Sequence, residues 1–187
     1  RGFGFGTSTE VDLQGEQVPS LRKENTWTDI DLATATFGQG IAVTPLQMLR
    51  AVSAIANGGK LPKVRVVDKI GDRKVEEVAP TRIISSKAAA EISQMMVNAV
   101  DMGEAKWSKP ADFSIAGKTG TAQIPIGGHY EKDKTIASFI GFAPALAPKF
   151  AMLVILREPK TSQWGSETAA PLWFDMAKEI YRYYHII

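Results

Sequence analysis

The chain has 187 residues, of which 44 % are hydrophobic and 22 % are charged, and its formal net charge is +2. This length fits one domain of about 100–200 residues, and the composition excludes a disordered polypeptide, which would have few apolar residues and a high net charge. The near-neutral charge balance gives no sign of binding to nucleic acid or to an anionic membrane surface.

The residue types also argue against a metal centre. The chain has no cysteine, which excludes a disulfide framework and a thiolate zinc site. It has only two histidines, His129 and His185, so a histidine-rich metal site is not expected. We therefore predict neither a metal nor a cofactor. No run of about 18 apolar residues indicates a membrane-spanning helix.

The first 32 residues are rich in Gly, Thr, Asp and Glu and predict a loop with no more than a short strand or turn. The chain begins at Arg1, without an initiator methionine or a signal peptide. The glycine-rich residues 2–6 resemble the middle of a polypeptide. We therefore expect a piece of a longer protein.

Two helices and a hairpin are predicted next. Thr44-Pro45-Leu46-Gln47 fits a capping box with proline at the first helical position, and the glycines at 58 and 59 end that helix. β-Branched residues on both sides of Gly71-Asp72 predict a hairpin. A second helix should run from Ser86 to about Val100, with one apolar face made of Ile92, Met95, Met96 and Ala99.

Three strands and a last helix complete the chain. The strands are predicted at 113–124, 135–143 and 150–156, and their short connections favour antiparallel pairing. The third is almost wholly apolar, so we expect it to be covered on both faces. The helix should span 168–184, with a stripe formed by Leu172, Met176, Ile180 and Tyr184. This order predicts a mixed α/β fold of the α+β type, in which helices cover an antiparallel sheet. Three tryptophans are assigned to packing: Trp27, Trp107 and Trp173.

The sequence Gly117-Lys118-Thr119-Gly120-Thr121 lies inside the first of these three strands. Glycines are unfavourable in a strand interior and often mark the close approach of a ligand or another backbone. One lysine and two threonine hydroxyls on an edge strand suit the carboxylate of a peptide laid beside it. The alternative interpretation is an ordinary edge strand with a solvated lysine.

The K-T-G triplet is the third element of the motif set of penicillin-binding proteins and β-lactamases, after S-x-x-K and S-x-N. In this chain several further motifs occur with the triplet in a fixed order. The whole series resembles the C-terminal half of the transpeptidase domain of class B penicillin-binding proteins. The sequence of residues 137–144 is similar to that of the division-specific, septal branch of this family. The resemblance covers nearly the whole chain and implies a β-lactamase/transpeptidase-like fold. It is carried by Phe37-Gly38-Gln39-Gly40, Val43-Thr44-Pro45-Leu46-Gln47, Ala54 to Gly59, Ala137-Ser138-Phe139-Ile140-Gly141-Phe142-Ala143-Pro144 and Ala169-Ala170-Pro171.

Members of this family cross-link peptidoglycan. The resemblance implies that a serine attacks the penultimate D-Ala of a D-Ala-D-Ala stem peptide, that D-Ala leaves, and that an amine of a second stem resolves the acyl-enzyme. Lys118 would place positive potential near the carboxylate and the serine. The hydroxyls of Thr119 and Thr121 would bind that carboxylate, and the Thr121 N–H would be one oxyanion donor, worth about 3–4 kcal/mol. Gly120 would allow close approach, and Trp164 would lie at the rim.

One part of the family pattern is missing. The chain contains no S-x-N, and its one S-x-x-K, at Ser20 to Lys23, lies in a polar segment without helical periodicity. We therefore expect residues 1–187 to be the C-terminal part of a single transpeptidase domain, without the N-terminal part that carries the nucleophile. The isolated chain should be inactive.

The resemblance leaves three other functions open: a penicilloyl sensor of the same fold, a D,D-carboxypeptidase or serine β-lactamase, and a docking module without chemistry. The runs at 37–59 and 137–144 favour the transpeptidase over the hydrolases. The expected partners are stem peptides, β-lactams, the missing part of the domain and membrane proteins of the divisome, with no nucleic acid. The expected location is the extracytoplasmic face of the bacterial cytoplasmic membrane.

Overall fold

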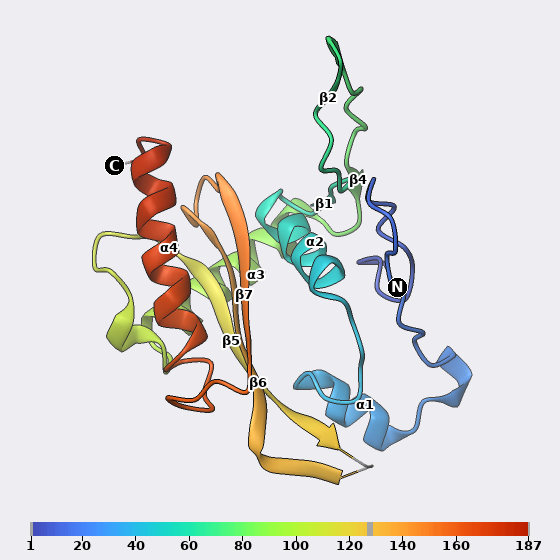
Figure 1. Ribbon diagram of the computed structural model, residues 1–187, viewed down its shortest axis with the longest axis vertical. Coiled ribbons are helices and arrows are strands. Elements are labelled where there is room, and N and C mark those ends of the chain that lie inside the picture. Colours follow the sequence, from blue (N-terminus) through green and yellow to red (C-terminus); the bar gives the residue numbers. More distant parts are fainter. Residues whose placement is uncertain (1, 127–128, 187) are drawn as a thin grey trace. The chain divides into compact units, whose positions relative to one another are not determined.

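The computed structural model describes residues 2–126 and 129–186, and of Glu24, Pro125, Ile126 and residues 129–133 it describes only the backbone. The chain divides into an N-terminal unit, Arg1–Ser85, and a C-terminal unit, Ser86–Ile187. The N-terminal unit contains η1 (Glu24–Thr26), α1 (Asp29–Thr36), α2 (Pro45–Ala56), β1 (Lys60–Leu61), β2 (Lys69–Ile70), β3 (Arg73–Lys74) and β4 (Thr81–Arg82). The C-terminal unit contains α3 (Ser86–Asp101), η2 (Lys106–Ser108), β5 (Ala116–Ile126), β6 (His129–Ala143), β7 (Phe150–Arg157) and α4 (Ala169–Tyr183) (Figure 1).

Helix α2 confirms the predicted capping box. The Thr44 side chain accepts a hydrogen bond from the Gln47 N–H, and the Gln47 side chain accepts one from the Thr44 N–H, both at 3.1 Å. The amide of Gln47, which is fully buried, also donates to the Thr7 carbonyl at 2.7 Å. The helix ends at Ala56, and Gly58 and Gly59 follow its C-cap, Asn57. A Cβ at Gly59 would lie 2.3 Å from the Ile84 carbonyl oxygen, so this position needs glycine for space as well as for its φ of +91°.

Helix α1 was not predicted, and the expectation of a loop up to residue 32 is wrong from Asp29 onward. The helix begins with its own capping box between Thr28 and Asp31. None of its residues is buried, and Ile30 and Leu32 are exposed. Because no apolar stripe faces a core, periodicity gave no signal, and only the cap pattern could have indicated this helix.

The predicted hairpin is confirmed, but it is short. Strands β2 and β3 pair Ile70 with Arg73 around Gly71-Asp72, with the glycine in the left-handed region that such turns require. A second ladder, β1 with β4, closes the arm that carries this hairpin (Figure 1). Strands β1 and β4 have two residues each, which is too short for a sequence pattern to show.

The carboxylates of the N-terminal segment hold this unit together by hydrogen bonds. Glu16 accepts from the Ser8 hydroxyl, and from the N–H and hydroxyl of Thr9 at 2.7 Å each. These donors lower the Glu16 pKa to about 2. Asp12 accepts from the N–H groups of Val67 and Val66 at 2.8 and 2.7 Å, which lowers its pKa as well. The first turns of the chain are thereby joined to the segment after α2.

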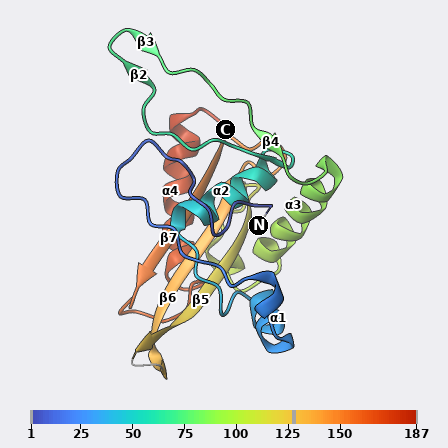
Figure 2. The same cartoon turned by 90° about the vertical axis from the view of Figure 1, so that its right-hand side faces the viewer.

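The C-terminal unit contains the predicted antiparallel sheet, in the order β5-β6-β7. Its register pairs Thr119 with Phe139 and Phe139 with Val154. Helix α3 contacts β5, whereas α4 packs against β6 and β7 (Figure 2). The expected mixed α/β architecture, an antiparallel sheet with helices against it, is therefore confirmed.

The core of this unit lies between the sheet and α4. The Phe139 ring lies 5.2 Å from that of Trp173 and 5.1 Å from that of Phe174, so Trp173 is a packing residue as expected. The predicted stripe of α4 is wrong: Leu172, Met176 and Tyr184 are exposed, and the buried face is Ala170, Trp173, Phe174, Ala177 and Tyr181. Both stripes have helical spacing, and the larger aromatic area is the one that is buried.

Three further expectations need correction. Strand β7 is not fully covered on both faces, because Val154 is buried whereas Ile155, on the opposite face, is exposed. In α3, Met95 is exposed, and the buried residues are Ala89 and Val100. Trp107, assigned above to packing, is 66 % exposed. The side chains of His129 and Tyr130 lie outside the described part of the chain.

The hydrogen bonds to Glu16 predict a pH dependence. Its folded-state pKa, about 2, lies below its ordinary value of 4.5. The stability that Glu16 contributes is therefore fully present above pH 4.5 and is lost as the pH falls through 4.5 toward 2. Thermal melts over this window should show a smaller loss of stability for Glu16→Gln than for the unsubstituted chain. The control is Glu76→Gln, an exposed carboxylate with no hydrogen bond or ion pair in residues 2–126 and 129–186. Equal pH profiles for all three proteins would contradict the assignment.

Candidate active-site strand

The K-T-G-T sequence lies in β5, which forms one edge of the three-stranded sheet. An edge strand has a row of backbone N–H and C=O groups without a partner strand. An extended peptide can pair with such an edge, with its affinity coming from the backbone and its specificity from side chains. The position of the motif therefore fits the binding of a peptide.

The two glycines of the motif have a packing role inside the sheet. A Cβ at Gly117 would lie 2.5 Å from Cζ of Phe139, and a Cβ at Gly120 would lie 2.5 Å from the Ser138 hydroxyl oxygen. The Phe139 ring thus occupies the space that a side chain at Gly117 would need. The glycine pattern that suggested a nearby ligand has an intramolecular cause at this position.

Lys118 carries an exposed positive charge. Because side chains alternate along a strand, Lys118 lies on the opposite face from Thr119 and Thr121. Its ammonium nevertheless reaches the strand edge, where it donates to the Thr119 carbonyl at 3.1 Å and to the Thr119 hydroxyl oxygen at 3.3 Å. Within the described residues it forms no ion pair. The charge is therefore available to an anionic ligand.

Thr121 is held in place by a loop. The backbone N–H of Gly165 donates to Oγ1 of Thr121 at 3.0 Å. A threonine hydroxyl has one donor and two acceptor positions, so this contact uses an acceptor position. In the described part of the chain the Thr121 hydroxyl donates to no other group. Its hydrogen can still be donated to a carboxylate.

The same loop lies tightly against the sheet. A Cβ at Gly165 would be 2.5 Å from the Gly120 carbonyl oxygen and 2.6 Å from that of Ser138. The Thr135 hydroxyl also donates to the Gln163 carbonyl at 2.8 Å. Trp164, 49 % exposed, is therefore fixed beside Thr121 by its neighbour Gly165. Sequence reasoning selected Trp164 but not Gly165, although a glycine next to an aromatic residue in a loop is a signal of close approach.

Ser20, the first residue of the S-x-x-K match, does not lie in a site of this kind. It is exposed in an irregular segment of the N-terminal unit, and no helix begins there. Among the described residues, no group of three or more Asp, Glu or His side chains could hold a metal ion. The part of the chain that the structure describes thus presents a strand edge with one unpaired ammonium and one oriented hydroxyl, and the S-x-x-K match at Ser20 does not begin a helix.

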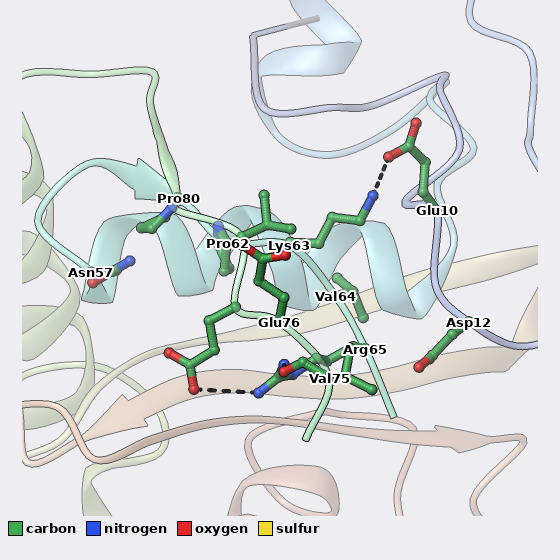
Figure 3. A pocket seen from close by; sticks show the side chains of 12 residues that line it. Glu10, Asp12, Asn57, Pro62, Lys63, Val64, Arg65, Val75, Glu76 and Pro80 are labelled. Carbon is green, nitrogen blue, oxygen red and sulfur yellow. Dashed lines mark hydrogen bonds and ion pairs between the residues drawn. The ribbon is translucent and has the colours of Figure 1, made fainter. Parts of the chain in front are cut away.

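A hollow in the N-terminal unit offers less to a charged substrate. It is lined by residues of the N-terminal segment and of the arm between β1 and β4 (Figure 3). Its two basic side chains are already paired: Lys63 with Glu10, and Arg65 with Glu77 at 3.4 Å. Its Asp12 carboxylate is occupied by two backbone N–H groups. The strand β5 is therefore the stronger candidate.

Sequence comparisons agree with the geometry. The family model of the penicillin binding protein transpeptidase domain matches residues 1–182. The chain is 36 % identical to stage V sporulation protein D of Bacillus subtilis, over 91 % of this chain and 28 % of that protein. It is 31 % identical to peptidoglycan D,D-transpeptidase FtsI of Escherichia coli, over 91 % of this chain and 29 % of that protein. The chain thus spans less than a third of the length of these relatives.

Solved structures show the same similarity. The transpeptidase domain of penicillin-binding protein 3 from Burkholderia pseudomallei matches with a TM-score of 0.85 and 29 % identity, over 97 % of this chain and 54 % of that one. Penicillin-binding protein 3 from Mycobacterium tuberculosis, complexed with ampicillin, matches with a TM-score of 0.85 and 28 % identity, over 99 % of this chain and 44 % of that one. The chain covers about half of the solved transpeptidase domain.

The loop contact at Gly165 can be tested by Gly165→Ala. The added methyl would overlap backbone oxygens of β5 and β6, which cannot turn away as a side chain can. We expect a loss of about 1–3 kcal/mol in the free energy of unfolding, measured in urea, as for other overpacked positions. The matched control is Gly2→Ala, where a Cβ meets no atom within 4 Å and stability should not change. Equal stability of the two variants would contradict the tight contact.

Proposed function

The chain belongs to the penicillin-binding protein transpeptidase family, and we propose that it supplies the K-T-G-T strand of a serine D,D-transpeptidase that cross-links the D-Ala-D-Ala stem peptides of peptidoglycan. The observation that carries this proposal is the edge strand β5. It combines an unpaired Lys118 ammonium with a Thr121 hydroxyl whose position is fixed by Gly165.

The proposed roles follow from this geometry. The stem peptide lies along β5, where its terminal carboxylate accepts hydrogen bonds from the hydroxyls of Thr119 and Thr121 and faces the charge of Lys118. Charge-assisted bonds of this kind are worth roughly 1.5–3 kcal/mol each. Gly120 has no side chain and so allows the peptide to approach the strand closely, and Trp164 lies at the rim of the site.

The chemistry needs one group that these 187 residues do not supply in a suitable place. The serine oxygen would form a bond to the penultimate D-Ala carbonyl carbon, and the Thr121 N–H would stabilise the developing oxyanion. The bond to the last D-Ala then breaks, and that residue leaves with a proton as a free amine-bearing product. An amine of a second stem displaces the serine. We propose that the serine belongs to a preceding part of the same domain and that residues 1–187 form its C-terminal part.

The relatives support a transpeptidase rather than a hydrolase, because the Escherichia coli relative is named a peptidoglycan D,D-transpeptidase. The ampicillin complex of the Mycobacterium tuberculosis relative supports β-lactams as ligands of this chain too. By extension we propose a role in division and divisome membrane proteins as partners. We also propose an extracytoplasmic location, on a membrane-anchored parent. No helix among the described residues is long and apolar enough to cross a membrane.

Lys118→Ala tests the role of the charge. The Lys118 side chain is exposed and contacts only its neighbour on the strand, so its removal should leave the melting temperature of the longer protein nearly unchanged. The loss of one charge-assisted bond should slow β-lactam acylation by about tenfold to several hundredfold. Lys118→Arg should restore only part of the rate, because a planar guanidinium does not replace a compact ammonium.

The control for this experiment is Lys87→Ala, an exposed lysine of α3 whose ammonium lies 3.9 Å from Glu91. Second-order acylation rates and thermal melts are measured for all variants. An unchanged acylation rate in Lys118→Ala, or a loss of rate fully explained by unfolding, would contradict the proposed role. Lys118 would then be a solvated lysine on an ordinary edge strand.

The assignment of the nucleophile to a preceding segment has its own test. A fluorescent penicillin should not label the 187-residue chain covalently, whereas the longer protein should be labelled at one serine. Ser20→Ala in the longer protein should leave this labelling intact, because Ser20 lies in an irregular, exposed segment. Stoichiometric labelling of the isolated chain would refute the assignment.

A further inference from the structure

A second hollow lies in the C-terminal unit, between the η2 region and the loop that precedes α4. Its volume is about 320 Å³, and it is lined by five residues: Glu104, Trp107, Trp164, Ser166 and Glu167. We call it the acidic aromatic hollow. Two carboxylates, two indoles and one hydroxyl form this lining, and none of them is cationic.

Both carboxylates of the hollow are free to bind a ligand. Across the described ranges 2–126 and 129–186, neither Glu104 nor Glu167 forms an ion pair or a side-chain hydrogen bond. Two neighbouring negative charges without a counter-charge attract a cation. Most other carboxylates of this unit differ in this respect, as shown by Asp101 with Lys109 and by Asp175 with Lys178.

The two tryptophans add a second reason for a cation. Trp107 is 66 % exposed and Trp164 is 49 % exposed. Such exposure is unusual for tryptophan, which is highly buried on average. The face of an indole is the best aromatic partner for an ammonium or guanidinium group. The exposure of Trp107, which contradicts its assignment to the core, is explained if this indole contacts a ligand.

Ser166 provides the independent observation. It is only 6 % exposed, and its hydroxyl makes no hydrogen bond within the described chain. No side-chain polar atom of the described residues is both fully buried and without a partner. The hydroxyl oxygen of Ser166 therefore keeps some exposure, and Ser166 lines the hollow. A buried hydroxyl with open acceptor positions is matched by an ammonium, which has only donors.

The hollow adjoins the motif strand through one residue. Trp164 and Ser166 flank Gly165, whose N–H is bonded to the Thr121 hydroxyl. A ligand in the hollow is thus next to the residue that is proposed to bind the stem peptide. The lining fits an organic cation, since it combines two carboxylates with two indoles and the described residues contain no group of three His, Cys, Asp or Glu side chains that could hold a metal ion.

We propose that the acidic aromatic hollow binds a protonated primary amine of a peptidoglycan stem peptide, an inference that rests on the proposed function. Glu104 and Glu167 supply the counter-charge, Trp107 and Trp164 contact the ammonium with their ring faces, and Ser166 accepts one of its hydrogens. The hollow holds the amine in its charged form, so it positions the peptide and takes no part in proton transfer.

Binding is measured on the full chain by NMR of the indole N–H groups. The probe is Nα-acetyl-lysine methylamide, and its control is the same molecule acetylated at Nε, which is neutral. The free amine should cause saturable shifts at Trp107 and Trp164. Trp173 is the internal reference, because its indole N–H is bonded to the Met152 carbonyl at 2.9 Å in the core and should not shift.

Substitutions test whether Glu104 and Glu167 supply the negative charge that binds the amine. Glu104→Gln with Glu167→Gln should weaken binding of the probe by about tenfold or more, the loss expected for charge-assisted bonds. The matched control is Glu91→Gln, an exposed carboxylate of α3 outside the hollow, which should bind like the unsubstituted chain. Urea unfolding of each variant confirms that the fold is retained, and Ser166→Ala provides a second, uncharged variant that should also bind more weakly.

Three results would overturn the proposal: equal shifts with the Nε-acetylated probe, no saturable shift at Trp107 and Trp164, or unchanged affinity in the double variant. Saturable binding of 1,5-diaminopentane without binding of the lysine derivative would assign the hollow to free polyamines instead of a peptide. These measurements use neither a β-lactam nor the serine. Failure of penicillin labelling in the longer protein would therefore reject the proposed function separately from amine binding in the hollow.

Discussion

The position of the Phe139 ring is the constraint on which the C-terminal unit depends. The ring lies against Trp173 and Phe174 of α4 and takes the space in which a side chain at Gly117 would stand. A β-carbon at Gly141 would likewise lie 3.2 Å from this ring. Phe139 therefore determines both how the helix covers the sheet and which residues β5 can carry. Tight aromatic packing of this kind tolerates little change in volume.

The candidate site is built on the same packing. Phe139 of β6 is paired with Thr119, and its neighbour Ala137 is paired with Thr121. The aromatic cluster packs α4 against the sheet, and the segment that enters α4 lies against the sheet beside these residues. It does so at Gly165, where only a glycine fits against the carbonyl groups of Gly120 and Ser138. The contact that orients the Thr121 hydroxyl thus comes from the segment that leads into α4.

The elements that could be predicted from the sequence are those with local signals. The capping box of Thr44 and Gln47 located α2, and strand-like runs of residues with short connections located β5, β6 and β7. Elements with weak or no local signals were missed. Helix α1 buries no residue and so has no apolar stripe, and its capping box was its one local signal. The β1–β4 ladder joins two residue pairs across the whole arm, and a window of sequence cannot show such tertiary contacts.

The errors on α4 and Trp107 have a different cause. Two stripes with helical spacing were present in α4, and spacing alone could not tell that Trp173 and Phe174 face Phe139. For Trp107 the general tendency of tryptophan to be buried gave the wrong answer, since its side chain is 66 % exposed.

The motif residues Lys118 to Thr121 were found because they follow a pattern of chemistry. The residues that pack against the motif and its loop are Phe139, Thr135 and Gly165. Their role could be identified only from the three-dimensional packing. Every contact described here for Lys118 and Thr121 lies within the C-terminal unit. The proposed recognition of a peptide carboxylate would therefore depend on contacts inside this unit, whereas the proposed covalent chemistry would also need a serine placed by another segment.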